Sequence, residues 1–375
     1  MANNKLHSWI KNIRMEWGFD SLAAISRTAA FGTIVALGSM LSSCNDLMHD
    51  DLPPCDMGVD LQFKYDYNVQ RADMFNDHVG GVCVFVFDEQ GNLVARQDAA
   101  NEGKSQPLKD PNYAMRIDLQ PGKYRFATFA FQKKYEEALS QAGAKFHIEV
   151  PAAGESIEKL RTRLDRNAGK VENQALPLDT LWQGLSNETV EVKDLQITHH
   201  TISLIRDTKQ LTISLHQLDE PADIHADDFS YQITDANGYI NYDNSLLPDE
   251  ELTYTPYKTW TTEFTTPEGT VQERTAHAAL MFSRLVLHPA TENDKNAILS
   301  IWNKKTGEEV VRINLADFLA QGRGAFEALN YSAQEFLDRE YDYKLDFFLK
   351  GDKWQYVKLG ISILDWSKRI QRADL

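Results

Sequence analysis

The residue with the clearest chemical signature in this chain is Cys44, which directly follows Leu41, Ser42 and Ser43. An uncharged, mostly apolar run, Thr28–Met40, ends just before this triplet. The residues ahead of the run carry more Lys and Arg than Asp and Glu. A basic start, a short apolar run and small residues before a cleavage point are typical of a secretory signal peptide. A cysteine directly after the cut is the position that bacterial lipoproteins acylate, so the pattern predicts lipid, such as palmitate, on Cys44.

The same segment could instead be an ordinary cleaved signal with an incidental cysteine. The apolar run is too short for a comfortable membrane span, which needs about 20 apolar residues. A multiply acylated cysteine would supply the two or more chains that stable membrane anchoring requires. The sequence therefore predicts a signal peptide over residues 1–43 and a lipidated tether over residues 44–57. The protein would be held on a membrane outside the cytoplasm.

The two remaining cysteines, Cys55 and Cys83, are candidates for a structural disulfide, because proteins outside the cytoplasm meet oxidising conditions. The bond would close a loop of about 28 residues, which stabilises by roughly 3 kcal/mol in the chain-entropy model. The alternative is a pair of buried free thiols. No histidine lies at zinc-ligand spacing from either cysteine, which disfavours a metal site.

The rest of the sequence offers little that points to catalysis. It contains no G-x-S-x-G, no H-E-x-x-H and no phosphate-binding loop. The formal net charge is −16, with 55 Asp and Glu against 39 Lys and Arg, which argues against a nucleic-acid partner. We therefore expect no enzyme, no catalytic residues, no metal ligands and no cofactor.

Three other groups of residues are candidates for binding sites. The acidic stretch from Asp219 to Asp228 could hold calcium, but it lacks the regular spacing and turn glycine of a calcium loop. Adjacent His199 and His200 would point to opposite faces of a strand. The tryptophans that follow the predicted signal peptide could form a sugar-binding platform. Tryptophan in a β-sandwich, however, usually packs in the core. They are Trp182, Trp260, Trp302, Trp354 and Trp366.

The elements that would position these residues are mainly β-strands. Gly58–Tyr67 alternates apolar and polar residues, and Val82–Phe87 is a continuous apolar run, as in a strand buried on both faces. The turn residues Asp88–Asn92 predict a hairpin after it. A second hairpin is expected between Tyr341–Leu349 and Tyr356–Ile363.

Two further local signals complete the prediction. Ser332 and Glu335 have the spacing of a capping box that opens a short helix. The motif D-x-x-G-x-[LI] occurs at Asp88 and again at Asp235, as expected if two similar sandwiches share a hairpin. Because a single sandwich has about 100 residues, we predict an all-β chain with two tandem sandwiches, residues 58–203 and 204–375.

Several segments together resemble the FimB-type fimbrillin-associated anchor family of Bacteroidales type V fimbriae. The likeness runs over most of the mature chain, and the segment around Tyr65-Asp66-Tyr67-Asn68 with its following cysteine is its most specific part. The segments are Leu52–Cys55, Val59–Asn68, Ala72–Phe75, Val84–Asp88, Leu119–Tyr124, Leu181–Gly184, Leu204–Thr208 and Phe336–Tyr343.

The resemblance implies two transthyretin-like β-sandwiches on a lipid anchor. It implies a non-catalytic subunit at the base of a fimbria that attaches the shaft to the outer membrane, exposed on the surface, and limits the length of the shaft. Its partner would be a shaft pilin, engaged by strand exchange or docking, in which a donated strand completes an open sheet edge. The paired cysteines resemble a recurring pair of this family. The alternative function is a glycan-binding surface lipoprotein of a nutrient-uptake system.

Replacing Cys44 by Ala is expected to release the protein from the membrane fraction, because the acyl chains would have no attachment point. Membrane retention after cell fractionation measures the effect. If the Cys44→Ala protein stays in the membrane fraction and fimbriae remain attached normally, the anchoring role of this cysteine is wrong.

Overall fold

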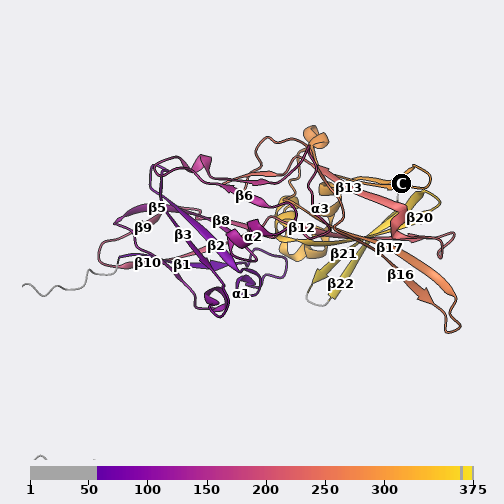
Figure 1. Ribbon diagram of the computed structural model, residues 1–375, viewed down its shortest axis with the longest axis horizontal. Helices are drawn as coiled ribbons and strands as arrows, with labels where there is room; N and C mark the ends of the chain where they lie inside the picture. The colour runs from indigo at the N-terminus through magenta and orange to yellow at the C-terminus, as the bar shows by residue number, and fades with distance from the viewer. Residues whose placement is uncertain (1–56, 364–365, 374–375) are drawn as a thin grey trace, which may run out of the picture. The chain divides into compact units, whose positions relative to one another are not determined.

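The computed structural model describes residues 57–363 and 366–373, with side chains up to residue 360 (Figure 1). Residues 55–375 group into one compact unit. Most of the described chain is strand, and the helices are short. The prediction of an all-β fold built from sandwiches is therefore confirmed. Cys44 and Cys55 lie outside the described residues.

The first half of the described chain, residues 57–206, forms two facing sheets and part of a third small sheet. One sheet has the strand order β10-β1-β4, and the other has the order β11-β8-β5-β2-β3, with β9 also paired to β5. The strands are β1 (Gly58–Lys64), β2 (Gly81–Phe87), β3 (Leu93–Ala100), β4 (Met115–Ile117), β5 (Gly122–Phe131), β6 (Phe146–Glu149), β7 (Arg161–Leu164), β8 (Leu181–Leu185), β9 (Val190–Val192), β10 (Ile197–Ser203) and β11 (Ile205–Arg206). Short helical segments are α1 (Phe75–His78), η1 (Pro107–Lys109), α2 (Tyr135–Ser140) and η2 (Ile157–Lys159).

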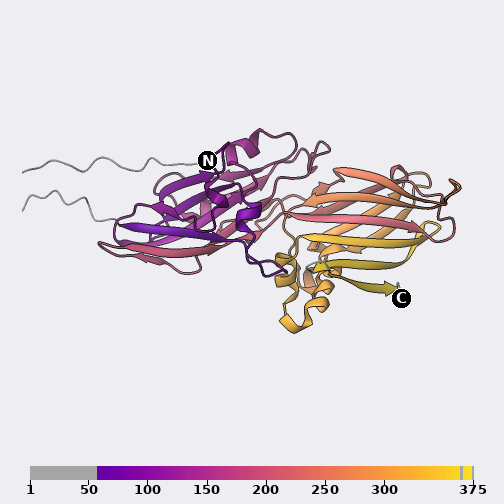
Figure 2. The same cartoon turned by 90° about the horizontal axis from the view of Figure 1, so that it is seen from below.

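The second half, residues 207–373, is built on a six-stranded sheet of order β16-β17-β12-β20-β21-β22 and a four-stranded sheet of order β15-β13-β18-β19 (Figure 2). Its strands are β12 (Lys209–Gln217), β13 (Phe229–Asp235), β14 (Tyr239–Asn241), β15 (Leu252–Tyr254), β16 (Lys258–Thr265), β17 (Val271–Phe282), β18 (Ile298–Asn303), β19 (Glu309–Asn314), β20 (Asp342–Lys350), β21 (Lys353–Ile363) and β22 (Trp366–Ala373). Helical segments are η3 (Ala226–Asp228), η4 (Ala290–Lys295), α3 (Leu315–Ala320), η5 (Gln321–Leu329) and α4 (Ala333–Arg339).

The strands form where the local sequence patterns predict them. Val59, Leu61 and Phe63 of β1 point into one core cluster, as their spacing of two requires. All residues of β2 are buried, because successive side chains enter core clusters on opposite faces of the sheet. The carboxylate of Asp88 accepts hydrogen bonds from the backbone N–H groups of Gln90 and Asn92, which closes the β2–β3 hairpin.

The end of the chain also follows its sequence signals. β20 and β21 pair as the predicted antiparallel hairpin. The hydroxyl of Ser332 accepts a hydrogen bond from the backbone N–H of Glu335 at 3.1 Å, which is one of the two bonds of a capping box and caps the start of α4.

One predicted hairpin is wrong because long-range pairing takes over. β14, which follows the Asp235 motif, does not pair with β13 but with β7 of the first half. β4 and β5, on either side of Pro121 and Gly122, lie in different sheets. The β14–β7 pairing and a core cluster shared by both halves tie the halves together. A domain boundary between residues 203 and 204 therefore stays a proposal.

Among the described residues, no helix has both the length and the apolar character needed to cross a bilayer.

The two facing sheets of the first half approach closely where β8 passes β10. A Cβ atom added at Gly184 would lie 2.7 Å from Cγ2 of Ile202, 2.8 Å from Cδ2 of Leu204 and 2.9 Å from the carbonyl oxygen of Ser203. Only glycine permits this approach, because each of these distances is shorter than a normal van der Waals contact.

Replacing Gly184 by Ala is expected to lower the free energy of unfolding by about 1–3 kcal/mol, the usual cost of overpacking. Gly324→Ala is the control, since a Cβ there meets nothing within 4 Å. Urea denaturation measures both variants. Equal stability of the Gly184→Ala variant and the wild type would contradict the close approach.

Candidate functional site

Four of the segments that carry the family resemblance meet in space. They are the segment after β1, strand β8, the connection after β10, and the segment from α4 to β20. We call their meeting point the junction, because it joins the two halves. Its residues are Tyr65, Tyr67, Trp182, Arg206, Asp207, Lys209, Arg284, Asp338, Arg339, Glu340 and Tyr341.

Arg206 occupies the aromatic part of the junction. Its guanidinium lies 4.1 Å from the ring centroid of Tyr341 and 5.7 Å from that of Trp182. Tyr65 meets the Trp182 ring edge-on, with centroids 5.8 Å apart. Burial lowers the pKa of Arg206, but a guanidinium stays charged in proteins. The side chain therefore forms a buried cation–π contact between the halves, which strengthens as water is removed.

Lys209, the first residue of β12, supplies the second buried cation. Its side chain is fully buried, and Nζ donates hydrogen bonds to the carbonyl oxygens of Asp338 at 3.0 Å and Glu340 at 2.9 Å. Burial lowers the pKa of Lys209. Because carbonyl oxygens satisfy the ammonium group, β12 is fixed to the end of α4 and the start of β20.

Three buried carboxyl groups lie near these cations. Arg284 donates two hydrogen bonds of 3.0 Å to the carboxylate of Asp338 in a fork geometry. Asp207 is fully buried, and burial raises its pKa, while Arg284, Asn244 and Lys209 act in the opposite direction. Burial likewise raises the pKa of Glu340 to about 7. The charges are thus held inside the protein by one another rather than by water.

A third arginine, Arg339, lies at the side of the junction. The guanidinium of Arg339 at the end of α4 lies 3.9 Å from the ring centroid of Tyr67 and 5.0 Å from that of Tyr331. Its Nε also donates to the carboxylate of Glu335 at 2.9 Å. Tyr67 belongs to the first half and Arg339 to the second, so this contact also resists separation of the halves.

Cys83, the described member of the predicted disulfide, is buried in β2. No disulfide is recorded for it among the described residues, and its Sγ lies 3.9 Å from Nη2 of Arg96. Burial raises the pKa of the thiol to about 12, which makes it unreactive. Its side chain joins the core cluster on the face of the sheet opposite β1. A bond to Cys55 would require the chain ahead of Gly58 to reach that face, and the pairing stays a prediction.

The described tryptophans occupy separate environments. Trp182 is buried in the junction, Trp260 stacks on His277 with centroids 4.9 Å apart, and Trp354 meets Phe347 edge-on. Trp302 is 40% exposed. They therefore do not form a shared sugar-binding platform.

The polar candidates also have structural partners. His199 lies 3.6 Å from the carboxylate of Asp60, whereas His200 stacks on Phe126, so the two rings face opposite ways as predicted. Within the acidic stretch, Asp219 accepts a hydrogen bond from the backbone N–H of Gly351, and Asp228 pairs with Lys305 at 2.8 Å. Among the residues that the structure covers, no three His, Cys, Asp or Glu side chains are arranged to hold a metal ion.

The six-stranded sheet ends in two strands that each pair on one side only. β16 pairs with β17, and β22 pairs with β21. Most residues of β16 are exposed. Such edges carry unpaired backbone donors and acceptors and are the places where another chain can add a strand.

The described chain is thus a β-sandwich protein. Its junction joins the two halves, and its open sheet edges are suited to association with other chains. The comparisons identify the group within this class: the chain belongs to the family of fimbrillin-A associated anchor proteins Mfa1 and Mfa2, which it matches over residues 52–372.

Several relatives share most of this chain. The minor fimbrium anchoring subunit Mfa2 of Porphyromonas gingivalis is 24% identical over 294 residues, which are 75% of this chain and 77% of that protein. A proposed adhesin of Bacteroides thetaiotaomicron has a similar structure, with a TM-score of 0.70, 29% identity, and coverage of 85% of this chain and 100% of that one. The solved fimbrial anchor protein Mfa2 of Porphyromonas gingivalis shares the fold, with a TM-score of 0.57, 17% identity, and coverage of 83% and 98%.

Replacing Lys209 by Met is expected to lower the free energy of unfolding by about 3–5 kcal/mol. The change keeps an unbranched side chain but leaves two buried carbonyl oxygens and nearby carboxylates without the cation. Urea denaturation measures the loss, and Lys344→Met, at an exposed position of β20, is the matched control. If both variants unfold at the same urea concentration, the buried ammonium does not hold the junction.

Proposed function

We propose that this protein is a lipid-anchored, non-catalytic subunit that attaches a fimbrial shaft to the outer membrane. The observation that carries the proposal is the family match over residues 52–372, which begins just after the lipidation motif at Cys44. In this proposal Cys44 is acylated after removal of residues 1–43. The protein is exposed on the cell surface.

The course of the chain supports this role. β1 begins at the end of the first half that points away from the second half (Figures 1 and 2). It runs towards the junction, where Tyr67 contacts Arg339. A tether that ends at residue 57 would therefore join the body at this end of the first half. A force that pulls the second half away from the membrane is transmitted through the junction.

The shaft pilin binds an open edge of the six-stranded sheet by strand exchange or by docking. Of its two edge strands we take β22 as the donor, because it pairs with β21 alone and can leave the sheet without breaking any other strand pair. A donated strand gains backbone hydrogen bonds along its whole length in the partner sheet. β16 is the alternative edge for docking.

The lipid anchor would also limit the length of the shaft. A subunit that is fixed to the membrane at its own base leaves no place for a further subunit below it. Its incorporation therefore ends elongation at that end of the shaft.

The direct test is a crosslinking pull-down from intact outer membranes with tagged protein, compared with a strain that lacks the gene. We expect a ladder of pilin with the tagged protein, and fimbriae that are shed or overlong in the deletion strain. Recovery of a porin-like transporter and glycan-degrading enzymes instead would contradict the anchor function and favour nutrient capture.

Removal of residues 366–375 is expected to reduce co-purified shaft pilin at least tenfold, because it removes the proposed donor strand. The body should stay folded, since β22 pairs with the sheet only through β21. Circular dichroism checks folding, and quantitative immunoblotting of the pilin measures binding.

The control shortens the tip of the β16–β17 hairpin, residues 266–270, at the opposite edge of the sheet. This variant should retain the pilin. Loss of pilin only in the hairpin variant would assign binding to β16 and contradict donation by β22.

A further inference from the structure

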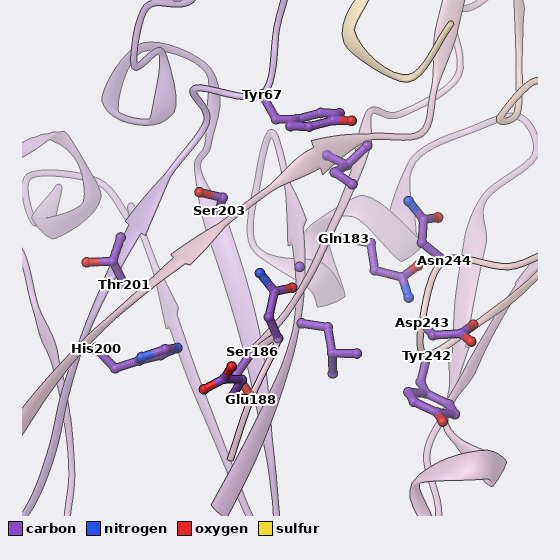
Figure 3. Close-up of a pocket in the computed structure, with 14 residues that line it drawn as sticks. Tyr67, Gln183, Ser186, Glu188, His200, Thr201, Ser203, Tyr242, Asp243 and Asn244 are labelled. Carbon is purple, nitrogen blue, oxygen red and sulfur yellow. The ribbon is translucent and has the colours of Figure 1, made fainter. Parts of the chain in front are cut away.

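The open edges of the fold differ in how easily another protein can reach them. β10 is the outer strand of a three-stranded sheet, but a cleft of about 600 Å³ beside it is walled by residues 185–188 and 242–244. Figure 3 shows Thr201 of β10 on one side of this cleft, and Asp243 and Asn244 on the other. A second protein that approached β10 would meet this wall first. The β10 edge is therefore recessed.

The edge of β16 is accessible. β16 forms the margin of the six-stranded sheet, and among the described strands only β17 pairs with it. It lies along the border of the second half (Figure 1). No residue of β16 is buried, and Phe264 is 63% exposed. The backbone N–H and C=O groups that point away from β17 are therefore open to a strand from another molecule.

β16 has few of the features that usually protect a sheet edge. Protected edges are short, or carry proline, several charges or a bulge. The part of β16 ahead of its bulge, residues 258–264, pairs with β17 in a regular register. It consists mostly of β-branched and aromatic residues, the types with the highest strand propensity. Its two charges, Lys258 and Glu263, lie near opposite ends.

The sequence of this segment is complementary to itself. Thr261 is the central residue of the range 258–264. A two-fold axis at Thr261, perpendicular to the sheet, places the same segment of a second copy antiparallel to the first. Opposite residues then lie on the same face of the joined sheet. The pairs are Thr261 with Thr261, Trp260 with Thr262, Thr259 with Glu263, and Lys258 with Phe264.

Each of these pairs is favourable. Threonine beside threonine and tryptophan beside threonine stabilise antiparallel strands. The Thr259 hydroxyl can donate to the Glu263 carboxylate. The Lys258 ammonium group lies 5.2 Å from the ring centroid of Trp260, and the pairing adds the exposed ring of Phe264 as a second aromatic partner. No like charges lie opposite each other, and every other symmetric register pairs fewer residues of the regular segment.

We propose that β16 pairs with β16 of a second copy of this chain. The two six-stranded sheets then form one continuous sheet across the two-fold axis at Thr261. Backbone hydrogen bonds along the strand hold the pair, and the side-chain pairs fix its register. The pairing leaves β22, at the other margin of the sheet, free for the proposed attachment of a shaft.

The antiparallel geometry decides which copies can meet. β12 begins at Lys209 in the junction, β17 is antiparallel to β12, and β16 is antiparallel to β17, so β16 runs away from the junction. The first halves of the two copies therefore lie at opposite ends of the joined sheet. Copies tethered to one membrane cannot adopt this arrangement, whereas copies on two facing membranes can. This step rests on the proposed lipid anchor, but the pairing itself does not.

The pair is weak in solution, because one strand edge is smaller than a standard protein interface. Many copies on each of two facing membranes bind together, and this multivalency raises the overall strength of the contact. Experiments on single copies and on membranes therefore test different parts of the proposal.

Oxidative crosslinking of the full-length protein in detergent tests the register. Thr261→Cys places two thiols opposite each other at the axis, where Cα atoms about 4.5–5.5 Å apart suit a disulfide. We expect at least tenfold more disulfide-linked dimer on a non-reducing gel than for the wild type. Thr201→Cys is the matched control, because Thr201 is an exposed threonine on the recessed edge of β10. Circular dichroism checks folding, since the Thr261 hydroxyl accepts a hydrogen bond from the backbone N–H of Ala226.

Charge variants test the pairing without a change at its centre. Thr259→Glu places a carboxylate opposite Glu263 of the second copy, and like charges directly opposite each other destabilise paired strands. The double variant Thr259→Glu with Glu263→Lys restores opposite charges in both symmetric contacts. Dynamic light scattering follows phosphatidylcholine vesicles that carry the lipidated protein. We expect the wild type, the double variant and the control Thr201→Glu to cluster the vesicles, and Thr259→Glu to leave them dispersed.

Several results would overturn the proposal. Equal crosslinking of the Thr261→Cys and Thr201→Cys variants would exclude the pairing, as would clustering by Thr259→Glu that equals that of the wild type. Crosslinking at position 261 with dispersed wild-type vesicles would support the pairing but exclude the arrangement between facing membranes. A protein that fails to bind vesicles would contradict the lipid anchor instead, and crosslinking in detergent would then decide the pairing alone.

Discussion

The interaction on which the rest of the structure depends is the burial of the Lys209 ammonium group between the carbonyl oxygens of Asp338 and Glu340. A charge removed from water must be satisfied completely, or the group loses its proton or the protein unfolds. Lys209 begins β12, a central strand of the six-stranded sheet, and its two acceptors end α4 and precede β20. One side chain therefore links the start of a central strand to the end of α4 and the start of β20.

The junction combines this ammonium with two arginines that rest on aromatic rings. An arginine keeps its charge under all conditions in which the protein is folded, so the contacts of Arg206 and Arg339 do not switch with pH. The same contacts involve residues separated by more than a hundred positions, and they join segments on either side of the connection between the halves. A hinge would place exposed polar residues and few contacts there. The buried charges and rings instead make a stiff connection, which is what a subunit loaded along its length requires.

The sequence predicts those features that depend on neighbouring residues. The alternation in β1, the apolar run of β2, the turn after Asp88 and the cap at Ser332 are all local, and each is found. The motif at Asp235 misleads because β14 finds its partner in β7, some 75 residues earlier, and no local pattern encodes that choice. The junction could be anticipated in part, since charged Arg206, Asp207 and Lys209 interrupt an apolar strand pattern. Their partners could not, because Arg284 and Asp338 are distant in sequence. The hydrogen bond from Gln183 to the carbonyl oxygen of Asn241 also has no sequence signal, since β8 and the turn after β14 are brought together only by the tertiary fold.

Asp207 shows how the charges of the junction depend on one another. Burial raises the pKa of its carboxyl group to about 7, and the nearby Arg284, Asn244 and Lys209 act in the opposite direction. Neither carboxylate oxygen of Asp207 has a hydrogen-bond partner. The nearby cations rather than hydrogen bonds therefore favour the charged form of this carboxyl group. Loss of the Lys209 cation would leave Asp207 and Asp338 with one positive charge fewer, so the group that links β12 to α4 also stabilises the carboxylates around it.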